Sequence, residues 1–206
     1  MKQGEMIINP LFAAPVMKTT LDIGSLERYR SFAIIKRAQD KSKNIDIIKS
    51  NVGGWHSKQL DLRDETIKIL LNKLGQPIDN FLDYYEVNKE KYYWEYSEAW
   101  FIINEKNNYN VPHIHQNSFL SGVFYLQTFD NSGDLVFHHH AKNIDYHKQP
   151  IDAFKNYEAH NSDIWKITPK NGDLIVFPSF LYHSVSENKS EDLRIILSFN
   201  INLVKK

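Results

Sequence analysis

Two histidines separated by a single residue, His113 and His115, lie in the segment NVPHIHQN and are followed by strand-forming residues. In a β-strand, residues i and i+2 project from the same face, so the two imidazoles project together if a strand begins near Pro112. Imidazole nitrogens bind transition metals at about 2.0–2.1 Å, which requires such convergence. The pair therefore indicates part of a metal site.

A third histidine, His183, lies in the segment FPSFLYHSVSEN, directly after the apolar run DLIVF. A jelly roll can bring this position over the strand that carries His113. The chain contains nine histidines, so this spacing also arises by chance. Two interpretations stay open on spacing alone: a three-histidine metal site, or histidines that are solvated or satisfied in the core.

The next residue with chemical potential is Arg194, which begins the apolar strand RIILSFNINLV. A buried guanidinium without an anion is costly, and its planar fork matches a carboxylate. The partner is then either a bound anionic ligand or a nearby acid, Glu191 or Asp192.

Composition limits the kinds of chemistry available. The chain has no cysteine, which excludes disulfides, thiolate metal sites, iron–sulfur clusters and a cysteine nucleophile. Any metal must be bound by histidine, carboxylate or water. Lysine plus arginine and aspartate plus glutamate both number 25, so charge gives no reason to expect bulk nucleic-acid or membrane-surface binding.

The chain of 206 residues is long enough for a single domain with a sizeable core. No apolar run reaches the length of a membrane span, and the first residues do not resemble a signal peptide. We therefore expect one soluble, cytoplasmic domain over residues 1–206. The aromatic-rich edge at residues 92–100 suggests a homodimer.

The N-terminal half reads as helical after an edge strand at residues 6–17. Ser25 is a helix cap for a stripe that includes Tyr29 and Ile35, and Asp64 caps a second helix. Gly75 and Pro77 predict the end of that second helix, and a third is expected over residues 78–85.

After about residue 90 the apolar period changes from 3.6 to 2. The sequence predicts a helical support region at residues 1–90 and a jelly-roll core at residues 91–206, an α+β fold that is mainly β.

Trp55 and His56 are expected in a turn packed on the sheet. His138, at the start of the run HHH, is expected at a pocket rim or in solvent. The polar segment 141–163 reads as a lid or binding loop. The expected strands are SFLSGVFYLQ, DLVFHH, DIWKIT, DLIVF and LRIILSFNINLV, together with the run from Tyr92 through AWFIIN.

These motifs, taken in order, resemble the iron(II)/2-oxoglutarate-dependent oxygenases, and most closely a subgroup of marine bacteria and phages. The resemblance implies a double-stranded β-helix with helices packed on one sheet. It covers most of the chain through the segments SNVGGWHSK (50–58), AWFIINEKNNYNVPHIHQNSFLSGVFYLQ (99–127), NSGDLVF (131–137), GDLIVFPSFLYHSV (172–185) and RIILSFNI (194–201).

By this resemblance, His113 is the first iron ligand, His183 is the distal histidine, and Arg194 pairs with the far carboxylate of 2-oxoglutarate. His115 is a departure, because the superfamily usually has Asp or Glu at that position. Three neutral imidazoles leave ferrous iron at a formal charge of +2, which should favour the anionic co-substrate. We expect His115 to be a ligand; the alternatives are water or a carboxylate such as Asp134.

A second departure lies beside the arginine, where related enzymes often carry serine two residues later. This chain has Ile196 there, and Ser198 lies two residues further along the same strand face. The other candidate co-substrate groups are polar residues on the expected strands. They are Tyr109, Tyr125, Asn104 and, as a pocket residue, Asn200.

The resemblance implies an enzyme that binds Fe(II) and 2-oxoglutarate, releases succinate and carbon dioxide, and hydroxylates a substrate. Two other hypotheses stay open: a cupin-type three-histidine dioxygenase without 2-oxoglutarate, and a non-catalytic jelly-roll module with a structural metal. The substrate, whether a small molecule or a protein side chain, cannot be read from the sequence.

Overall fold

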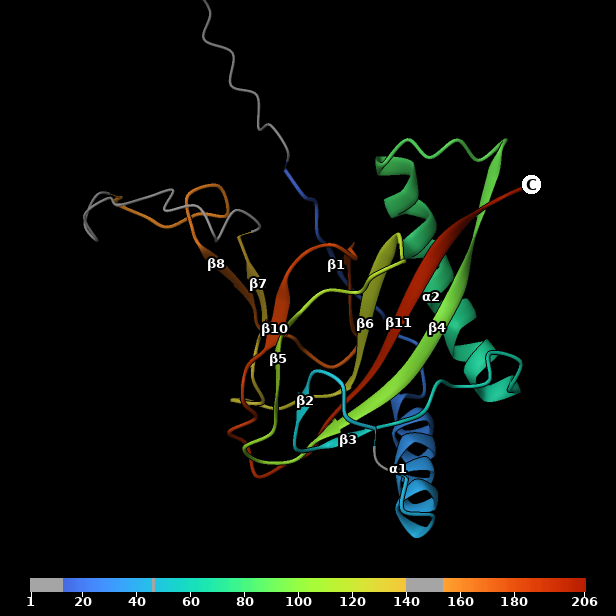
Figure 1. Cartoon of the computed structure of the whole chain (residues 1–206), viewed down its shortest axis with the longest axis vertical. Helices are drawn as coiled ribbons and strands as arrows, with labels where there is room; N and C mark the ends of the chain where they lie inside the picture. The colour runs from blue at the N-terminus through green and yellow to red at the C-terminus, as the bar shows by residue number, and fades with distance from the viewer. Residues whose placement is uncertain (1–12, 46, 140–153) are drawn as a thin grey trace, which may run out of the picture.

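The strands, along which apolar residues alternate, form two antiparallel sheets that face each other (Figure 1). The computed structural model describes residues 13–45, 47–139 and 154–206. Within these ranges the elements are β1 (Met17–Thr20), α1 (Leu26–Ser42), β2 (Asn51–Val52), β3 (Trp55–His56), α2 (Glu65–Tyr84), β4 (Tyr92–Asn104), β5 (Tyr109–His113), β6 (Leu120–Gln127), β7 (Leu135–His138), β8 (Ile164–Ile167), β9 (Asp173–Pro178), β10 (His183–Val185) and β11 (Arg194–Lys205).

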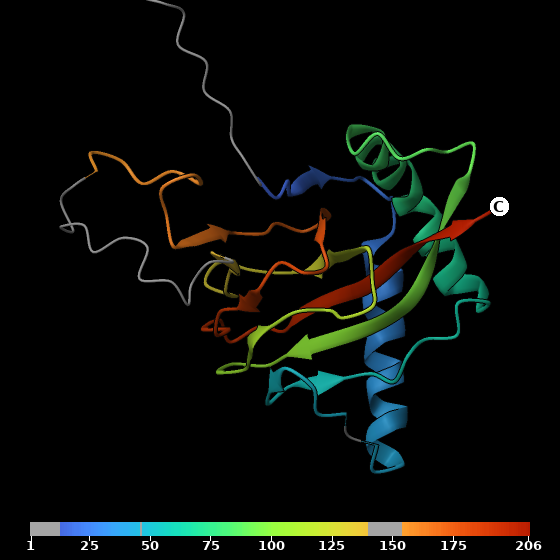
Figure 2. The same cartoon turned by 45° about the horizontal axis from the view of Figure 1, so that its top comes forward.

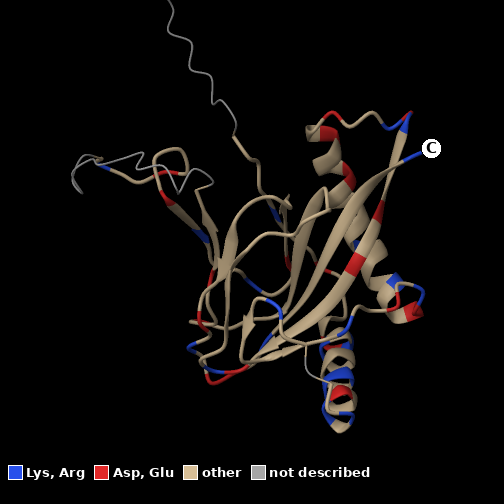
Figure 3. Ribbon diagram, viewed as in Figure 1, with Lys and Arg blue, Asp and Glu red and all other residues tan. Residues whose placement is uncertain are grey.

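The larger sheet has the order β1-β9-β6-β11-β4-β3, and the smaller has the order β2-β5-β10-β7-β8. Both helices pack on the outer side of the larger sheet (Figures 1 and 2). The predicted jelly roll with helices on one sheet is therefore confirmed. Charged residues gather on α1, near the ends of α2 and in the loops (Figure 3).

Strand alternation divides the core into two layers. On β11, Leu197, Phe199 and Ile201 face the helices and join the larger apolar cluster. Ile196 faces the space between the sheets, in a second cluster with residues such as Tyr125. A period of two thus gives one strand both a packing face and a face available to a site.

The second helix departs from its predicted end. Asp64 accepts hydrogen bonds from the backbone amides of Thr66 and Ile67, as expected of a cap. However, α2 continues through Gly75 and Pro77 to Tyr84, so no separate third helix exists over residues 78–85. The apolar stripe keeps the helical period on both sides of Pro77, and its burial outweighs the lost backbone hydrogen bond.

Four other expectations need correction or lie outside the described ranges. Ile35 is 57% exposed, so the buried face of α1 is made by Tyr29 and Ala33. Trp55 and His56 form the short strand β3 rather than a turn. Most of the predicted edge strand 6–17, and residues 141–153 of the predicted loop, lie outside the described residues.

A two-glycine connection carries the chain from one sheet to the other. Gly53 and Gly54 lie between β2 and β3, which belong to different sheets, and their φ angles are +66° and +69°. Side chains are strained at such angles, and a Cβ at Gly54 would meet the carbonyl oxygen of Ile103 at 2.9 Å. This connection places His56 beside the space between the sheets.

Two glycine substitutions should move stability in opposite directions. A Cβ at Gly75, inside α2, would meet only Trp94 at 4.0 Å, whereas one at Gly122 would lie 2.1 Å from the Phe199 ring. We expect Gly75→Ala to raise the free energy of unfolding by about 0.5–1 kcal/mol and Gly122→Ala to lower it by about 1–3 kcal/mol. Urea unfolding measures both, and equal effects would contradict the packing described.

Candidate metal centre

Two neighbouring strands of the smaller sheet bring two of the three histidines together. His183 begins β10 and lies opposite His113, the last residue of β5. The register between these strands shifts, so that Val185 lies opposite Asn110 rather than Val111. Bulges of this kind re-aim side chains, and this one is consistent with both Asn110 and His113 lining the interior.

His115 reaches the same place by a different route from the one predicted. No strand begins near Pro112; instead β5 ends at His113, and residues 114–119 form a turn and loop before β6. The backbone amide of His115 donates to the carbonyl of Ser179 at 3.0 Å, which ties this loop to the end of β9. The predicted convergence of His113 and His115 is therefore confirmed, but the predicted backbone was wrong, because a loop rather than a strand carries His115.

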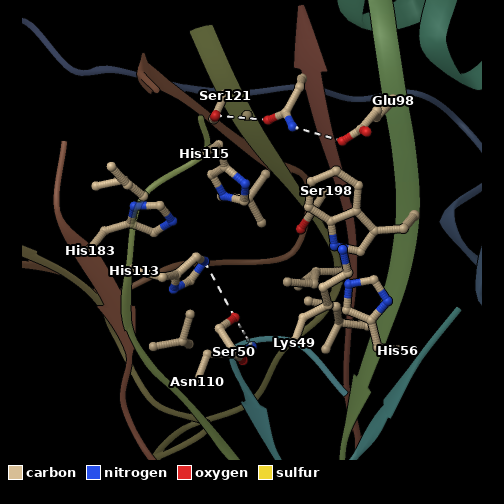
Figure 4. A pocket seen from close by; sticks show the side chains of 18 of the residues that line it. Lys49, Ser50, His56, Glu98, Asn110, His113, His115, Ser121, His183 and Ser198 are labelled. Atoms are coloured by element: carbon tan, nitrogen blue, oxygen red, sulfur yellow. Dashed lines mark hydrogen bonds between the residues drawn. The ribbon is translucent and has the colours of Figure 1, made fainter. Parts of the chain in front are cut away.

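The three imidazoles face one another (Figure 4). One nitrogen from each of His113, His115 and His183 lies within 4.8 Å of the others. The ring centroids are 4.3 Å apart for His113 and His183, and 5.0 and 5.1 Å for the pairs with His115. Asp134, the proposed substitute ligand, is not part of this group; its carboxylate accepts a hydrogen bond from Thr168.

Backbone carbonyls fix the tautomer of two of the rings. Nδ1 of His113 lies 2.8 Å from the carbonyl oxygen of Val111, and Nδ1 of His183 lies 2.8 Å from that of Leu181. A carbonyl only accepts, so each Nδ1 carries the proton and each Nε2 keeps a lone pair that can bind a metal or accept from a hydroxyl. The His115 ring has no hydrogen-bond partner within the described part of the chain.

Burial keeps the rings neutral. It lowers the pKa of His183 to about 3 and that of His115 to about 4, with a further contribution from the neighbouring His113. Burial also lowers the pKa of His113, opposed by its hydrogen bond to Val111. Metals bind neutral imidazole, so the site needs no proton release near pH 7.

These shifts predict an acid-sensitive metal-free protein. Unfolding returns each ring to a pKa of about 6.5, so below that pH the unfolded chain binds protons that the folded chain does not. Their stabilising effect is complete above pH 6.5 and is lost as the pH falls toward 4 for His115 and toward 3 for His183. For His183 the slope approaches about 1.4 kcal/mol per pH unit. Between pH 7 and pH 5, urea unfolding should show a smaller loss of the free energy of unfolding in His183→Asn than in the wild-type protein. Identical pH dependence in the two proteins would contradict this.

Two polar residues beside His113 were not predicted. The Asn110 amide donates to the Ser50 hydroxyl at 3.1 Å, and that hydroxyl lies 3.4 Å from Nε2 of His113 (Figure 4). Asn110 is three residues from His113, so alternation alone would place it on the opposite face. No sequence signal marked the bulge that brings the two together.

Arg194 is fully buried and lacks an acidic partner among the described residues. Its Nη1 donates to the carbonyls of Ser132 and Ser186, while Nε and Nη2 have no hydrogen-bond partner. Neither Glu191 nor Asp192 pairs with it, and Glu191 instead pairs with Lys106. Burial lowers the pKa of Arg194 to about 10, which still leaves it charged at neutral pH.

Close to Arg194, Tyr125 has a buried hydroxyl that also lacks a partner. Burial raises the pKa of Tyr125, so its hydroxyl stays protonated and is available as a donor. Buried polar groups in folded proteins are almost always satisfied. Two guanidinium donors and one phenol donor left open in one region form a cradle for an anion.

A cavity of about 870 Å³ extends from the histidines to Tyr125, whereas Arg194 itself does not line it. The three histidines line it together with Tyr125 and Ser198, in the size range of small-molecule sites. The remaining lining includes Lys49, Ser50, His56, Lys58, Glu98, Trp100, Asn110, Ser121 and Asn200.

The other predicted residues lie elsewhere. Tyr109 is 38% exposed and does not line the cavity, and Asn104 is buried opposite Arg194 in the β4–β11 register but does not line it either. His138 is buried on β7 with Nε2 2.8 Å from the Ser184 hydroxyl, rather than at the cavity rim. His140 lies outside the described residues.

The donor set fits ferrous iron and a small dicarboxylate. Three neutral nitrogens converge within 4.8 Å of one another, with lone pairs available on two rings, and could together hold one ion. The unpaired donors of Arg194 and Tyr125 suit a carboxylate that arrives with the metal. Three protein ligands leave coordination positions open, which a closed structural site does not.

Comparison with known proteins agrees with this geometry. Residues 98–200 match a family model described as "Putative 2OG-Fe(II) oxygenase", and these residues make up half of the chain. The chain belongs to this oxygenase family. The matched segment includes all three histidines and Arg194.

Solved structures of 2-oxoglutarate oxygenases share the fold. A Pseudomonas putida prolyl-4-hydroxylase is 13% identical, with 94% of this chain and 95% of that chain covered and a TM-score of 0.61. The viral collagen prolyl hydroxylase of Paramecium bursaria Chlorella virus-1, solved with 2-oxoglutarate, is 16% identical over 90% and 94%, with a TM-score of 0.55. HygX from Streptomyces hygroscopicus, with nickel and 2-oxoglutarate bound, is 11% identical over 92% and 82%, with a TM-score of 0.55. A search of curated protein sequences found no match.

The 2-oxoglutarate/iron(II) oxygenase family fixes the enzyme class and its cofactors. The protein is an oxygenase that uses Fe(II) with 2-oxoglutarate as co-substrate, as the sequence resemblance implied. Among the described helices, none has the length and apolar character needed to cross a bilayer.

Proposed function

We propose that this oxygenase hydroxylates its substrate at an iron centre bound by His113, His115 and His183, with 2-oxoglutarate anchored by Arg194. The observation that carries the proposal is the convergence of three imidazole nitrogens within 4.8 Å in one cavity. When bound, iron and 2-oxoglutarate together activate dioxygen, and the co-substrate leaves as succinate and carbon dioxide.

The residues of the chain act on binding and orientation. Hydrogen bonds from Nδ1 to backbone carbonyls orient the His113 and His183 rings, so that Nε2 of each ring would hold the ion. The open Nε and Nη2 donors of Arg194, with the Tyr125 hydroxyl, bind the far carboxylate of the co-substrate. Ser198 lines the cavity and lies on the same strand face as Arg194, on the side where the co-substrate would bind.

The lack of a carboxylate ligand has an electrostatic consequence. Three neutral ligands leave the full charge of the ferrous ion to attract the dianionic co-substrate, and Arg194 adds a further positive charge. We expect this site to favour 2-oxoglutarate binding. The cavity is larger than a small diacid needs, which leaves space near the ion for a small-molecule or side-chain substrate.

The organisation of the chain is also part of the proposal. Residues 1–206 act as a single domain, because α1, α2 and the larger sheet contribute to one apolar cluster. A second copy pairs along the outer edge of β4 near Tyr92 and Tyr93, where both tyrosines are exposed. A cytoplasmic location fits, because a reducing compartment keeps iron ferrous. Light scattering of the purified protein tests the dimer.

Anaerobic addition of Fe(II) and then 2-oxoglutarate tests the iron site. The expected result is a visible metal-to-ligand charge-transfer band, followed on exposure to air by formation of succinate. A cupin-type enzyme without 2-oxoglutarate, or a structural metal site, would give iron binding but no band. Absence of the band in folded, iron-loaded protein would refute the proposal.

A further inference from the structure

One wall of the cavity carries a chain of hydrogen bonds that the iron and co-substrate roles do not use. The Ser121 hydroxyl lies 2.8 Å from that of Ser179 and donates to Oδ1 of Asn200 at 2.8 Å. The Asn200 amide then donates to Oε2 of Glu98 at 3.2 Å (Figure 4). Ser121, Ser179 and Asn200 are all at most 2% exposed, so their positions are fixed by burial.

This buried chain ends on an exposed carboxylate. Glu98 lines the cavity and is the only acidic residue that does so within the described part of the chain. It forms no ion pair with any described residue. A carboxylate oxygen has more than one lone pair, so Glu98 can accept hydrogen bonds from a cation while it accepts from the Asn200 amide.

Two lysines supply the opposite charge. Lys49 and Lys58 line the same cavity, are exposed, and also lack ion-pair partners in the described ranges. Lys49 comes from the segment before β2 and Lys58 from the segment after β3, whereas Glu98 lies on β4. Figure 4 shows Lys49 and Glu98 reaching the cavity from different elements, across from the three histidines.

Two stacked rings form an aromatic surface among these charges. The His56 and Trp100 rings both line the cavity and are stacked, with an interplanar angle of 9° and centroids 5.7 Å apart. Burial lowers the pKa of His56, so this surface is uncharged near pH 7. The Trp100 ring also contacts His115, with centroids 5.6 Å apart, so a molecule on this surface lies next to the iron ligands.

We propose that the substrate is a small zwitterion of the amino-acid type, with its ammonium group bound by Glu98 and its carboxylate bound by Lys49 and Lys58. The inference rests on the proposed function, because it places the carbon chain of the substrate over the Trp100 surface and beside the metal ligands. A substrate with only one charge would engage either Glu98 or the lysines but not both, whereas a zwitterion matches the charges on both sides of the cavity.

Calorimetric titration of the full chain, loaded anaerobically with Fe(II) and 2-oxoglutarate, tests this. The probes are the twenty common amino acids and linear amino acids with a terminal amine. We expect at least one to bind, and its N-acetyl and methyl-ester derivatives to bind at least about tenfold more weakly, because each loses one charge-assisted contact.

Variants assign each charge to its residue. Glu98→Gln should weaken the zwitterion about tenfold or more but should not further weaken its N-acetyl derivative. The double variant Lys49→Gln, Lys58→Gln should weaken the zwitterion but not its methyl ester. Glu95→Gln is the matched control, because Glu95 lies on the same strand, is exposed and does not line the cavity.

The outcomes separate this inference from the function on which it depends. No charge-transfer band in the wild-type protein would refute the proposed function and remove the basis of the inference. A normal band without binding of any zwitterion would overturn the inference alone. Binding that Glu98→Gln and Glu95→Gln reduce equally would overturn the role of Glu98.

Discussion

Replacing His183 with alanine is expected to reduce bound iron to background and to lower 2-oxoglutarate turnover by more than a hundredfold. His183 is 4% exposed and lies closest to His113, with ring centroids 4.3 Å apart. Its loss leaves two nitrogens on a short loop and a strand end, which make a weak site. Loss of a residue that merely orients a ligand typically costs 10–100-fold, so loss of a ligand should exceed that.

Iron content after anaerobic loading and desalting measures this effect. His160→Ala is the control, because His160 is exposed and does not line the cavity. The control should retain one iron per chain. Stoichiometric iron in His183→Ala would contradict the assignment, whatever the activity.

His115 calls for a different pair of variants, because its ring lacks the carbonyl contact that fixes His113 and His183. His115→Ala should lose iron affinity, whereas His115→Asp should restore it by supplying the carboxylate that related enzymes use. Equal iron affinity in wild-type and His115→Ala protein would show that water fills this position.

The accuracy of the sequence-based predictions varied with how local each determinant is. The Asp64 cap and the period-two strands depend on neighbouring residues, and both were predicted correctly. The predicted end of α2 was wrong. Gly75 and Pro77 are strong local signals for a helix end, but burial of the apolar stripe of α2 overrides them. Tertiary packing, which the local pattern does not contain, decided that element.

The same distinction applies within the site. His113, His115 and His183 were selected by type and spacing, and the structure brings them together. Their geometry was not predictable, because it depends on a register shift in β5 and on a loop tied to Ser179. Ser50, Asn110 and Glu98 were missed for a similar reason: no motif marks a residue that reaches a cavity through a bulge or from a distant segment.

The second large effect is expected at Arg194, where methionine should abolish measurable 2-oxoglutarate binding without unfolding the protein. Removing one member of a buried charge pair costs about 2–5 kcal/mol, which corresponds to a roughly 30- to 5,000-fold loss of affinity. Calorimetric titration of iron-loaded, oxygen-free protein with 2-oxoglutarate measures it. The charge-transfer band should disappear in parallel.

The stability of Arg194→Met distinguishes a binding role from a structural one. Without co-substrate, Arg194 is a buried cation with two unpaired donors, and its Nη1 packs so closely under Gly133 that a Cβ there would lie 2.6 Å away. Methionine removes the desolvation cost but leaves the carbonyls of Ser132 and Ser186 without this donor. These effects oppose each other, so we expect the free energy of unfolding to change by less than about 2 kcal/mol.

A matched arginine gives the opposite pattern. Arg37 forms an ion pair with Glu105 away from the cavity, so Arg37→Met should lower stability slightly and leave 2-oxoglutarate affinity unchanged. Saturating 2-oxoglutarate at 100 times its dissociation constant should stabilise wild-type and Arg37→Met protein by about 2.7 kcal/mol, and Arg194→Met protein not at all. If Arg194→Met keeps this stabilisation, the guanidinium does not bind the co-substrate, and its two open donors must serve some other anion.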